Sequence, residues 1–322
     1  MKGSTRLLTV MLAAVGLAAA QEVISAKAGL IHYVQGRVLL DSKAVEPKFG
    51  SFPQMHAGSQ LRTEEGRAEV LLTPGVFMWV GENSSWRLVS DRLADTRVEV
   101  LGGSALIECI ELPKENSVTL LYQNAVISLR KGGLYRLNTD PAELRVMEGQ
   151  AEVQQGGQFV AVKKGRLLTL DGTLLLHNFD TKTGDTLSRW SRQRAEALAM
   201  VNVSAARSIW QSGQQWRMRD WYWNPYFGMF TYMPLRGVYR SFWGYSFWSP
   251  RQVYVVFQPP QMGGGMPDAS RSYNRDLGYT TVSSTSAGTS GTIATSSAPT
   301  AASQSSTASI PRQSSQAGGK GR

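Results

Sequence analysis

The segment "GRAEVLLTPGVFMWVGENSSWRLV" (Gly66–Val89) decides the fold class of this chain. Its β-branched, aromatic and other apolar residues alternate with polar ones in short runs. Pro74-Gly75 and the polar stretch that begins at Gly81 interrupt these runs at the spacing expected of turns. This pattern predicts short antiparallel strands joined by hairpins.

The same pattern continues on both sides of this segment, and it predicts a mainly β domain over residues 28–172. We expect a sandwich or a short β-solenoid of antiparallel strands. Val98–Glu108 aligns without gaps with Leu144–Gln154, and Val76–Leu88 resembles Val126–Leu137 at a similar offset. The repeat suggests an internal duplication in which two β units share one core.

These motifs resemble the FecR domain family. Gly58–Thr63 matches the family's G-x-x-L-x-T step, and Gly66–Leu72 matches its G-x-A-x-V-x-L strand. Leu101, Gly103 and Ala105 match its L-x-x-G-x-A strand with altered spacing. The resemblance implies a β fold. Because the matching residues are turn glycines and core positions, the resemblance specifies a fold better than a function.

The N-terminus, residues 1–20, is typical of a secretory signal peptide. Lys2 and Arg6 flank the start of the apolar run "LLTVMLAAVGLAAA" (Leu7–Ala20), which ends in small residues. We predict cleavage after Ala20; an uncleaved anchor is the alternative. The run is shorter than the ~20 residues that span a bilayer. The mature chain is therefore expected to have no transmembrane helix and to be periplasmic or secreted.

The composition changes after the β domain. Residues 183–207 have a helical apolar pattern with Asp185 as the expected N-cap. Residues 210–260 form an aromatic, Arg- and Pro-rich module that we expect to have little regular structure, apart from a strand over Gln252–Phe257. The low-complexity residues 261–322 predict a disordered tail.

The aromatic stretch "WYWNPYFGMFTYMPLRG" (Trp221–Gly237) allows three interpretations. It packs against the β domain, it stacks on sugar rings and holds anionic groups through Arg, or it attaches to a membrane surface. If it binds a ligand, the candidate residues are Trp221, Tyr222, Trp223, Tyr226, Phe227, Arg217 and Arg219.

The titratable residues show no catalytic or metal-binding pattern. His32, His56 and His177 are scattered, and Cys109 is the only cysteine. Cys109 shares an alternating face with Ala105, so we expect it to be a buried apolar residue rather than a nucleophile. We predict that the chain is not an enzyme and uses no cofactor or metal.

The net charge of +10 lies mainly in the C-terminal half of the chain. It favours an anionic partner, and export makes nucleic acid the least expected one. We predict a non-catalytic exported cell-envelope protein that binds or scaffolds an envelope glycan, an anionic lipid surface or a periplasmic protein. The alternative is periplasmic signal relay through a protein partner. The resemblance implies relay because the best-known family members are anchored regulators, although we expect a signal peptide here in place of their anti-sigma and transmembrane segments.

Overall fold

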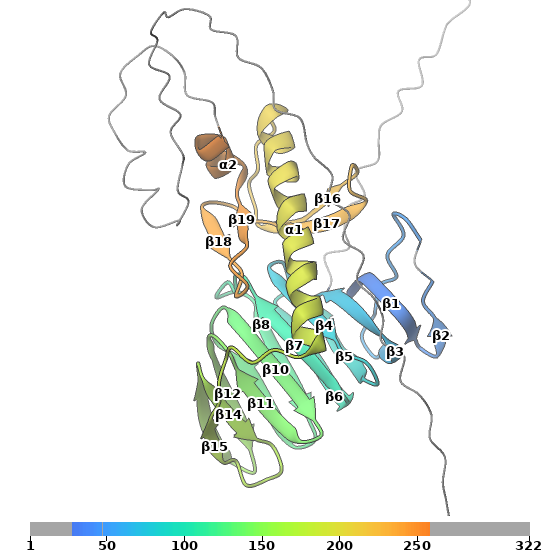
Figure 1. The fold of residues 1–322 in the computed structure, drawn as a ribbon, viewed down its shortest axis with the longest axis vertical. Coiled ribbons are helices and arrows are strands. Elements are labelled where there is room, and N and C mark those ends of the chain that lie inside the picture. Colours follow the sequence, from blue (N-terminus) through green and yellow to red (C-terminus); the bar gives the residue numbers. More distant parts are fainter. Residues whose placement is uncertain (1–27, 47, 258–322) are drawn as a thin grey trace, which may run out of the picture. The chain divides into compact units, whose positions relative to one another are not determined.

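The computed structural model describes residues 28–46 and 48–257 (Figure 1). The predicted signal peptide with its cleavage site after Ala20, and the predicted tail 261–322, lie outside the described residues. Within the described part of the chain, no helix has the length and the apolar character needed to cross a bilayer.

The described chain is mainly β, as the sequence predicts. One sheet contains β1 (Leu30–Leu40), β2 (Lys43–Ala44), β3 (Gln60–Leu71), β4 (Val76–Val80), β5 (Ser85–Arg92), β6 (Asp95–Gly102), β7 (Ser104–Cys109), β8 (Ser117–Tyr122), β9 (Ala125–Leu129), β10 (Gly133–Thr139), β11 (Ala142–Val146), β12 (Gln150–Gln155), β13 (Gln158–Lys163), β14 (Arg166–Thr169) and β15 (Leu176–Asn178). After it come α1 (Thr186–Gln211), the hairpin β16 (Asp220–Asn224) and β17 (Met229–Met233), the hairpin β18 (Val238–Arg240) and β19 (Ser246–Trp248), and α2 (Pro250–Phe257).

The sheet folds over at β3. One edge of this strand pairs with β1, while the other pairs with β5 at Gln60–Arg62 and with β4 at Ala68–Leu71. The half that contains β5, β6, β8, β9, β12 and β13 therefore faces the half that contains β4, β7, β10, β11 and β14. A single apolar core fills the space between the two halves. All the pairings are antiparallel except that of β6 with β8.

The strand pairing repeats where the sequence repeats. β5 pairs with β6 and β4 with β7; in the second copy β10 pairs with β11 and β9 with β12. Each copy contributes strands to both halves of the sheet, so the two units share one core. This is the arrangement expected of the predicted internal duplication.

β4 departs from simple alternation because all five of its residues are buried. Val76, Met78 and Val80 face the core between the halves, whereas Phe77 and Trp79 belong to a second apolar cluster on the outer face. A strand that is apolar on both faces requires a cover on each.

α1 and the aromatic hairpins provide this second cover. Phe77 lies edge-on to Trp221 of β16, with ring centroids 5.1 Å apart, and it also contacts Phe247 of β19. Leu198 of α1 joins the same cluster. The aromatic stretch is thus largely a packing element, which was one of the three interpretations of the sequence.

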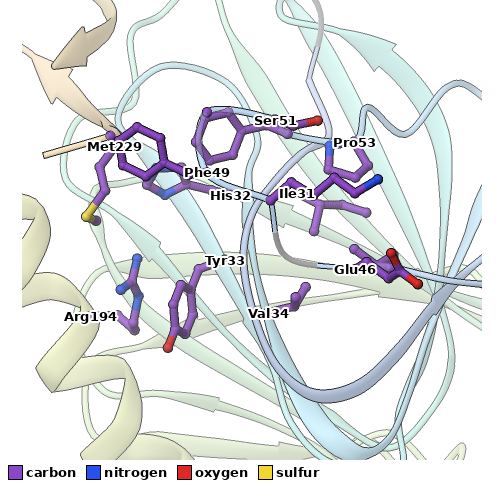
Figure 2. A pocket seen from close by; sticks show the side chains of 15 residues that line it. Ile31, His32, Tyr33, Val34, Glu46, Phe49, Ser51, Pro53, Arg194 and Met229 are labelled. Carbon is purple, nitrogen blue, oxygen red and sulfur yellow. The ribbon is translucent and has the colours of Figure 1, made fainter. Parts of the chain in front are cut away.

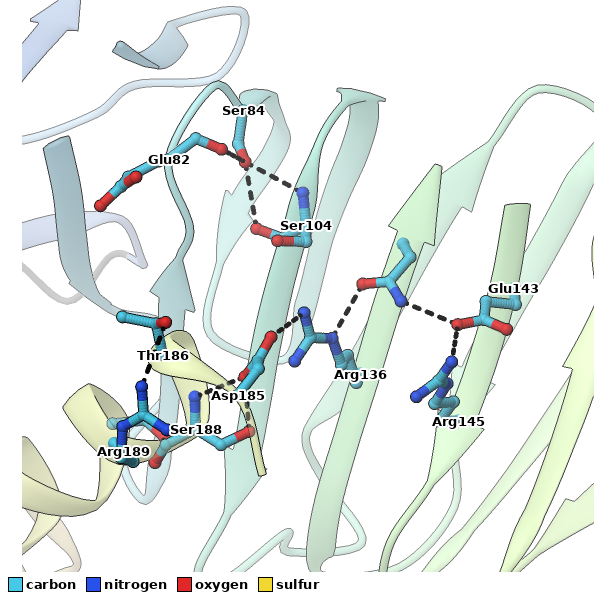
Figure 3. A network of polar contacts seen from close by, with 12 residues as sticks. Glu82, Ser84, Ser104, Arg136, Glu143, Arg145, Asp185, Thr186, Ser188 and Arg189 are labelled. Atoms are coloured by element: carbon cyan, nitrogen blue, oxygen red, sulfur yellow. Dashed lines mark hydrogen bonds and ion pairs between the residues drawn. The ribbon is translucent and has the colours of Figure 1, made fainter. Parts of the chain in front are cut away.

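Asp185 fixes the start of α1 on the sheet (Figure 3). Its carboxylate accepts a hydrogen bond from the amide of Ser188 at 2.9 Å, which confirms the predicted N-cap, and it pairs with Arg136 of β10 at 2.6 Å. Partial burial raises the pKa of Asp185, but Arg136 and Ser188 together lower it well below its usual value. Arg136 continues the chain of contacts through Asn138 to Glu143.

Two expectations for the aromatic module were wrong. It forms two regular hairpins, and Gln252–Phe257 belongs to helix α2 instead of a strand. Pro250 suits a first helical turn because its φ is already fixed, and the amides of Gln252 and Val253 both donate to the carbonyl of Ser249. Val253 is buried in a small apolar cluster with Ala206 and Ile209 of α1.

Phe77→Ala tests whether the outer face is a true second core. We expect it to lower the free energy of unfolding by about 3–5 kcal/mol, because the cavity lies under the aromatic hairpins. Phe159→Ala is the matched control: Phe159 is 63% exposed and its loss should cost under ~0.5 kcal/mol. Equal effects of the two substitutions in urea unfolding would show that the hairpins do not pack on β4.

Candidate functional site

A groove opens along the edge of β1 that β3 does not use (Figure 2). The chain after β2 is held to β1 at two points: the amide of Val45 donates to the carbonyl of Val38, and the amide of Ile31 donates to that of Pro53, both at 2.9 Å. Between these points lies a cavity of about 340 Å³, which we call the aromatic groove. Its lining includes Tyr33, Lys48, Phe49, Phe52, Arg194 and Met229.

Aromatic rings form much of the wall. Phe49 is 84% exposed and Tyr33 is 41% exposed, so both present ring surface to a partner. Phe52 lies deeper, with its ring centroid 5.2 Å from that of Phe230. Gly228 has a positive φ, and a methyl group there would overlap the ring of Phe49. This glycine therefore lets the ring lie against the turn of the first hairpin.

A buried carboxylate lies behind the groove. Glu69 of β3 is fully buried and accepts hydrogen bonds from His32 Nδ1 at 2.6 Å and from Trp79 Nε1 at 3.0 Å. Arg194 of α1 donates to both carboxylate oxygens, from Nε and Nη2, each at 3.0 Å. We call these four residues the Glu69 network.

His32 extends the Glu69 network to the first aromatic hairpin. The amide of Phe230 donates to His32 Nε2 at 2.9 Å, so this nitrogen carries a lone pair and Nδ1 carries the proton given to Glu69. One carboxylate therefore ties together β1, β3, β4, α1 and β17.

The network keeps Glu69 ionised and provides hydrogen-bond donors to both of its carboxylate oxygens. Burial raises the pKa of Glu69, but the charge of Arg194 and the hydrogen bond from His32 outweigh it and hold the pKa far below the usual range. Four donors saturate the carboxylate, so it is poorly suited to accept a proton from a substrate. The Arg194 guanidinium also lies 4.0 Å from the centroid of the Tyr33 ring, and this contact holds that ring as one wall of the groove.

The predicted aromatic site residues are divided between packing and surface. Trp221 is 7% exposed and packs on Phe77, whereas Tyr222 faces the opposite side of β16 and meets Trp216. Trp223 is partly buried beside Phe52 of the groove. The remaining two, Tyr226 at 84% and Phe227 at 40% exposure, occupy the turn next to Gly228. The turn of this hairpin thus adjoins the aromatic groove.

The two predicted arginines lie elsewhere. Arg219 pairs with Glu115 at 2.9 Å and with Glu111 at 3.5 Å, and so joins the module to the segment after β7. Arg217 is exposed, donates to the side-chain oxygen of Gln215, and lines a separate pocket at the end of α1. The seven candidates therefore do not converge on one site.

Sequence reasoning missed the Glu69 network and the exposed ring of Phe49. A signal for Glu69 was present: it shares the outer face of β3 and β4 with Phe77 and Trp79, whose apolar character shows that this face is covered. An acid on a covered face needs buried donors, and Arg194 of α1 is one of them. The sequence contains no local signal for Phe49, because its position depends on the path after β2.

Glu108 of β7 is a second buried acid, with a different environment. It is 1% exposed; one oxygen accepts the amide of Phe242 at 2.7 Å, and the other has no partner among the described residues. Burial raises the pKa of Glu108 to about 8, against a small opposing effect of the Phe242 amide. Burial thus favours the neutral form of this carboxyl group. It lines neither the groove nor the pocket at the end of α1.

Comparisons with known proteins leave the family open. No family model matches the chain, and no curated protein does. Among solved structures, it is similar to two from Parabacteroides distasonis that are provisionally described as anti-sigma factors. One is 14% identical with a TM-score of 0.35, covering 41% of this chain and 64% of its own. The other is 16% identical with a TM-score of 0.33, and the match covers 38% of this chain and 59% of the other protein's chain. Similarity this weak has no bearing on function.

The described residues contain no group of three or more His, Cys, Asp or Glu side chains placed to hold a metal ion. Cys109 is buried, as expected, and burial raises the pKa of its thiol above the usual range.

Arg194→Leu tests the energetic weight of the Glu69 network. It leaves a buried carboxylate without its cation, so we expect the free energy of unfolding to fall by about 3–5 kcal/mol. Arg130→Leu is the control, because the Arg130–Glu152 pair is exposed and should contribute under ~1 kcal/mol. Adding Glu69→Gln to Arg194→Leu should recover part of the loss, since the unpaired charge is then removed. Additive losses would contradict this account.

Glu108→Gln tests the raised pKa. Between its ordinary value of 4.5 and the folded value of about 8, the folded state binds the proton more tightly, so stability falls as pH rises through this window. The slope reaches at most ~1.4 kcal/mol per pH unit. The fall in the free energy of unfolding with rising pH should be shallower in Glu108→Gln than in wild type. It should be unchanged in the control Glu152→Gln. Parallel curves for wild type and Glu108→Gln would contradict the assignment.

Proposed function

We propose that this chain is a non-catalytic exported cell-envelope protein that binds an envelope component in the aromatic groove. The observation that carries the proposal is the exposure of Phe49 and Tyr33 beside a rigid floor made by the Glu69 network. Large aromatic surfaces held in place at little entropic cost are typical of binding sites. The apolar N-terminal run supports export.

The shape of the groove favours an extended protein segment. It lies beside β1 between the two points where the chain after β2 is held, and over this short stretch an added strand can pair with the backbone of β1. Phe49, Phe52 and Met229 provide an apolar recess for a bulky side chain. Lys48 and Glu46 lie at the groove as well, so charges of both signs are available to fix the register of a bound strand.

The buried acids support a non-catalytic role. Glu69 is saturated by structural donors, and Glu108 is enclosed under the second hairpin. Neither has the open position that a general acid or base needs for contact with a substrate.

A second function, periplasmic signal relay, uses the same groove. A strand edge suits a protein partner, and the resemblance to FecR-type regulators implies such a partner. The partner's identity separates scaffolding from relay, since relay requires a component of a signalling system.

A retention assay tests the proposal. Immobilised protein from Gln21 onward is exposed to envelope extracts of the source organism, with Phe49→Ser as the variant. We expect Phe49→Ser to retain at least about fivefold less of a specific component, because an anchor side chain of an interface commonly contributes more than ~1 kcal/mol. Phe159→Ser is the control, since it removes another exposed phenylalanine.

The nature of the retained material completes the assay. Loss of retention after protease treatment of the extract indicates a protein partner, whereas loss after muramidase treatment indicates a glycan. Equal retention by Phe49→Ser and Phe159→Ser would exclude the groove as the contact surface. Separately, full-length protein should be sensitive to external protease in spheroplasts; resistance there would contradict export.

A further inference from the structure

A second pocket lies where the C-terminal end of α1 meets the start of α2. It has a volume of about 460 Å³ and is lined by Trp210, Gln214, Trp216, Arg217, Pro250 and Arg251, among others. We call it the basic pocket. Its size suits a ligand of one or two sugar rings.

Trp210 lines the basic pocket, and a neighbouring ring outside the lining holds its side chain in place. Trp210 stacks on Tyr254 of α2, with centroids 4.4 Å apart and planes inclined by 26°. The two side chains remain 39% and 37% exposed, so the pair presents ring surface that the fold does not cover. Packing on each other holds both rings in place before any ligand binds.

The charge of this pocket is positive and uncompensated. Arg217 and Arg251 both line it, and no acidic residue among those that the structure describes does. Arg217 donates to Gln215 Oε1 at 2.7 Å, which orients its guanidinium without neutralising it. By contrast, Arg219 nearby in sequence is paired with two glutamates. An anion is therefore the expected partner of this pocket.

Trp216 and two glutamines complete the lining of the basic pocket. The indole N–H of Trp216 is buried and has no acceptor among the described residues. Gln214 and Gln215 add amide groups to the lining.

We propose that the basic pocket binds a saccharide unit that carries an anionic group, either carboxylate or phosphate. The sugar ring stacks on Trp210, the anionic group bonds to Arg217 and Arg251, and the hydroxyls bond to the side-chain amides of Gln214 and Gln215. The polar lining and concave shape favour this ligand over a membrane surface, which needs protruding apolar side chains.

The site is separate from the aromatic groove, and the inference goes beyond the proposed function. The groove lies on β1 and the turn between β16 and β17, whereas the basic pocket is built by α1, α2 and the segment between α1 and β16. One chain thus presents a protein-binding edge and a site for an anionic glycan.

Indole N–H signals in two-dimensional NMR test the inference on protein from Gln21 onward. The probes are glucuronic acid and glucose 6-phosphate, with glucose and inorganic phosphate as the neutral and sugar-free counterparts. We expect both anionic sugars to shift the Trp216 and Trp210 indole signals, assigned with Trp216→Phe and Trp210→Phe. Glucose and inorganic phosphate should bind at least about tenfold more weakly, because each lacks one of the two recognised groups.

Substitution of single arginines by glutamine tests whether the positive charge of the pocket contributes to binding. Arg217→Gln and Arg251→Gln should each weaken binding of the anionic sugars about tenfold. Arg189→Gln, an exposed arginine at the other end of α1, should leave it unchanged. Equal effects of all three substitutions, or equal affinity for glucose and glucose 6-phosphate, would overturn the inference.

Two further measurements identify the source of the saccharide unit and distinguish this proposal from the one for the aromatic groove. Muropeptides and soluble anionic polysaccharide show which glycan supplies the unit, and binding of either in an Arg217-dependent manner supports the site. Binding only to phosphatidylglycerol vesicles would overturn it in favour of a membrane contact. Phe49→Ser should leave sugar binding intact, so failure of the groove and failure of the basic pocket are distinguishable.

Discussion

The buried carboxylate of Glu69 is the constraint on which the arrangement of this chain depends. A fully buried charge is stable only with complete pairing, and its donors come from Arg194 of α1, His32 of β1 and Trp79 of β4. Because His32 also accepts the amide of Phe230, the same charge fixes the first aromatic hairpin. The β domain, the helix and the aromatic module therefore meet at this polar centre, beside the apolar cluster that they share.

Much of the fold could be predicted from local sequence, because strand alternation, turn glycines and the Asp185 cap are local signals. The hairpins of the module and helix α2 could not, since short apolar runs such as Gln252–Phe257 fit either a strand or a helix until their packing is known. The site was the least predictable part. Trp221 has the sequence appearance of a ligand platform but is buried, whereas Phe49 is exposed in a segment without any motif. Both outcomes depend on contacts between residues far apart in the chain.

The two surfaces follow from how the outer face of the sheet is covered. α1 covers β4 and β7 and extends past the sheet, so its far end is free to build the basic pocket with α2. The part of α1 that lies over the sheet contributes Arg194 to the lining of the aromatic groove. A rigid helix between two sites suits a scaffold, because it keeps two bound components at a fixed separation. The proposed envelope function and the anionic saccharide site are compatible roles of one such scaffold.

Native-state hydrogen exchange measures most directly whether the β domain and the aromatic module are one cooperative unit. The informative amides are those of Phe230, which donates to His32, and of Ile107 in the core of the sheet. Our account predicts the same opening free energy for both, because the Glu69 network joins the two parts. Exchange of the Phe230 amide at a much lower free energy than that of Ile107 would show that the module opens independently and would contradict the account.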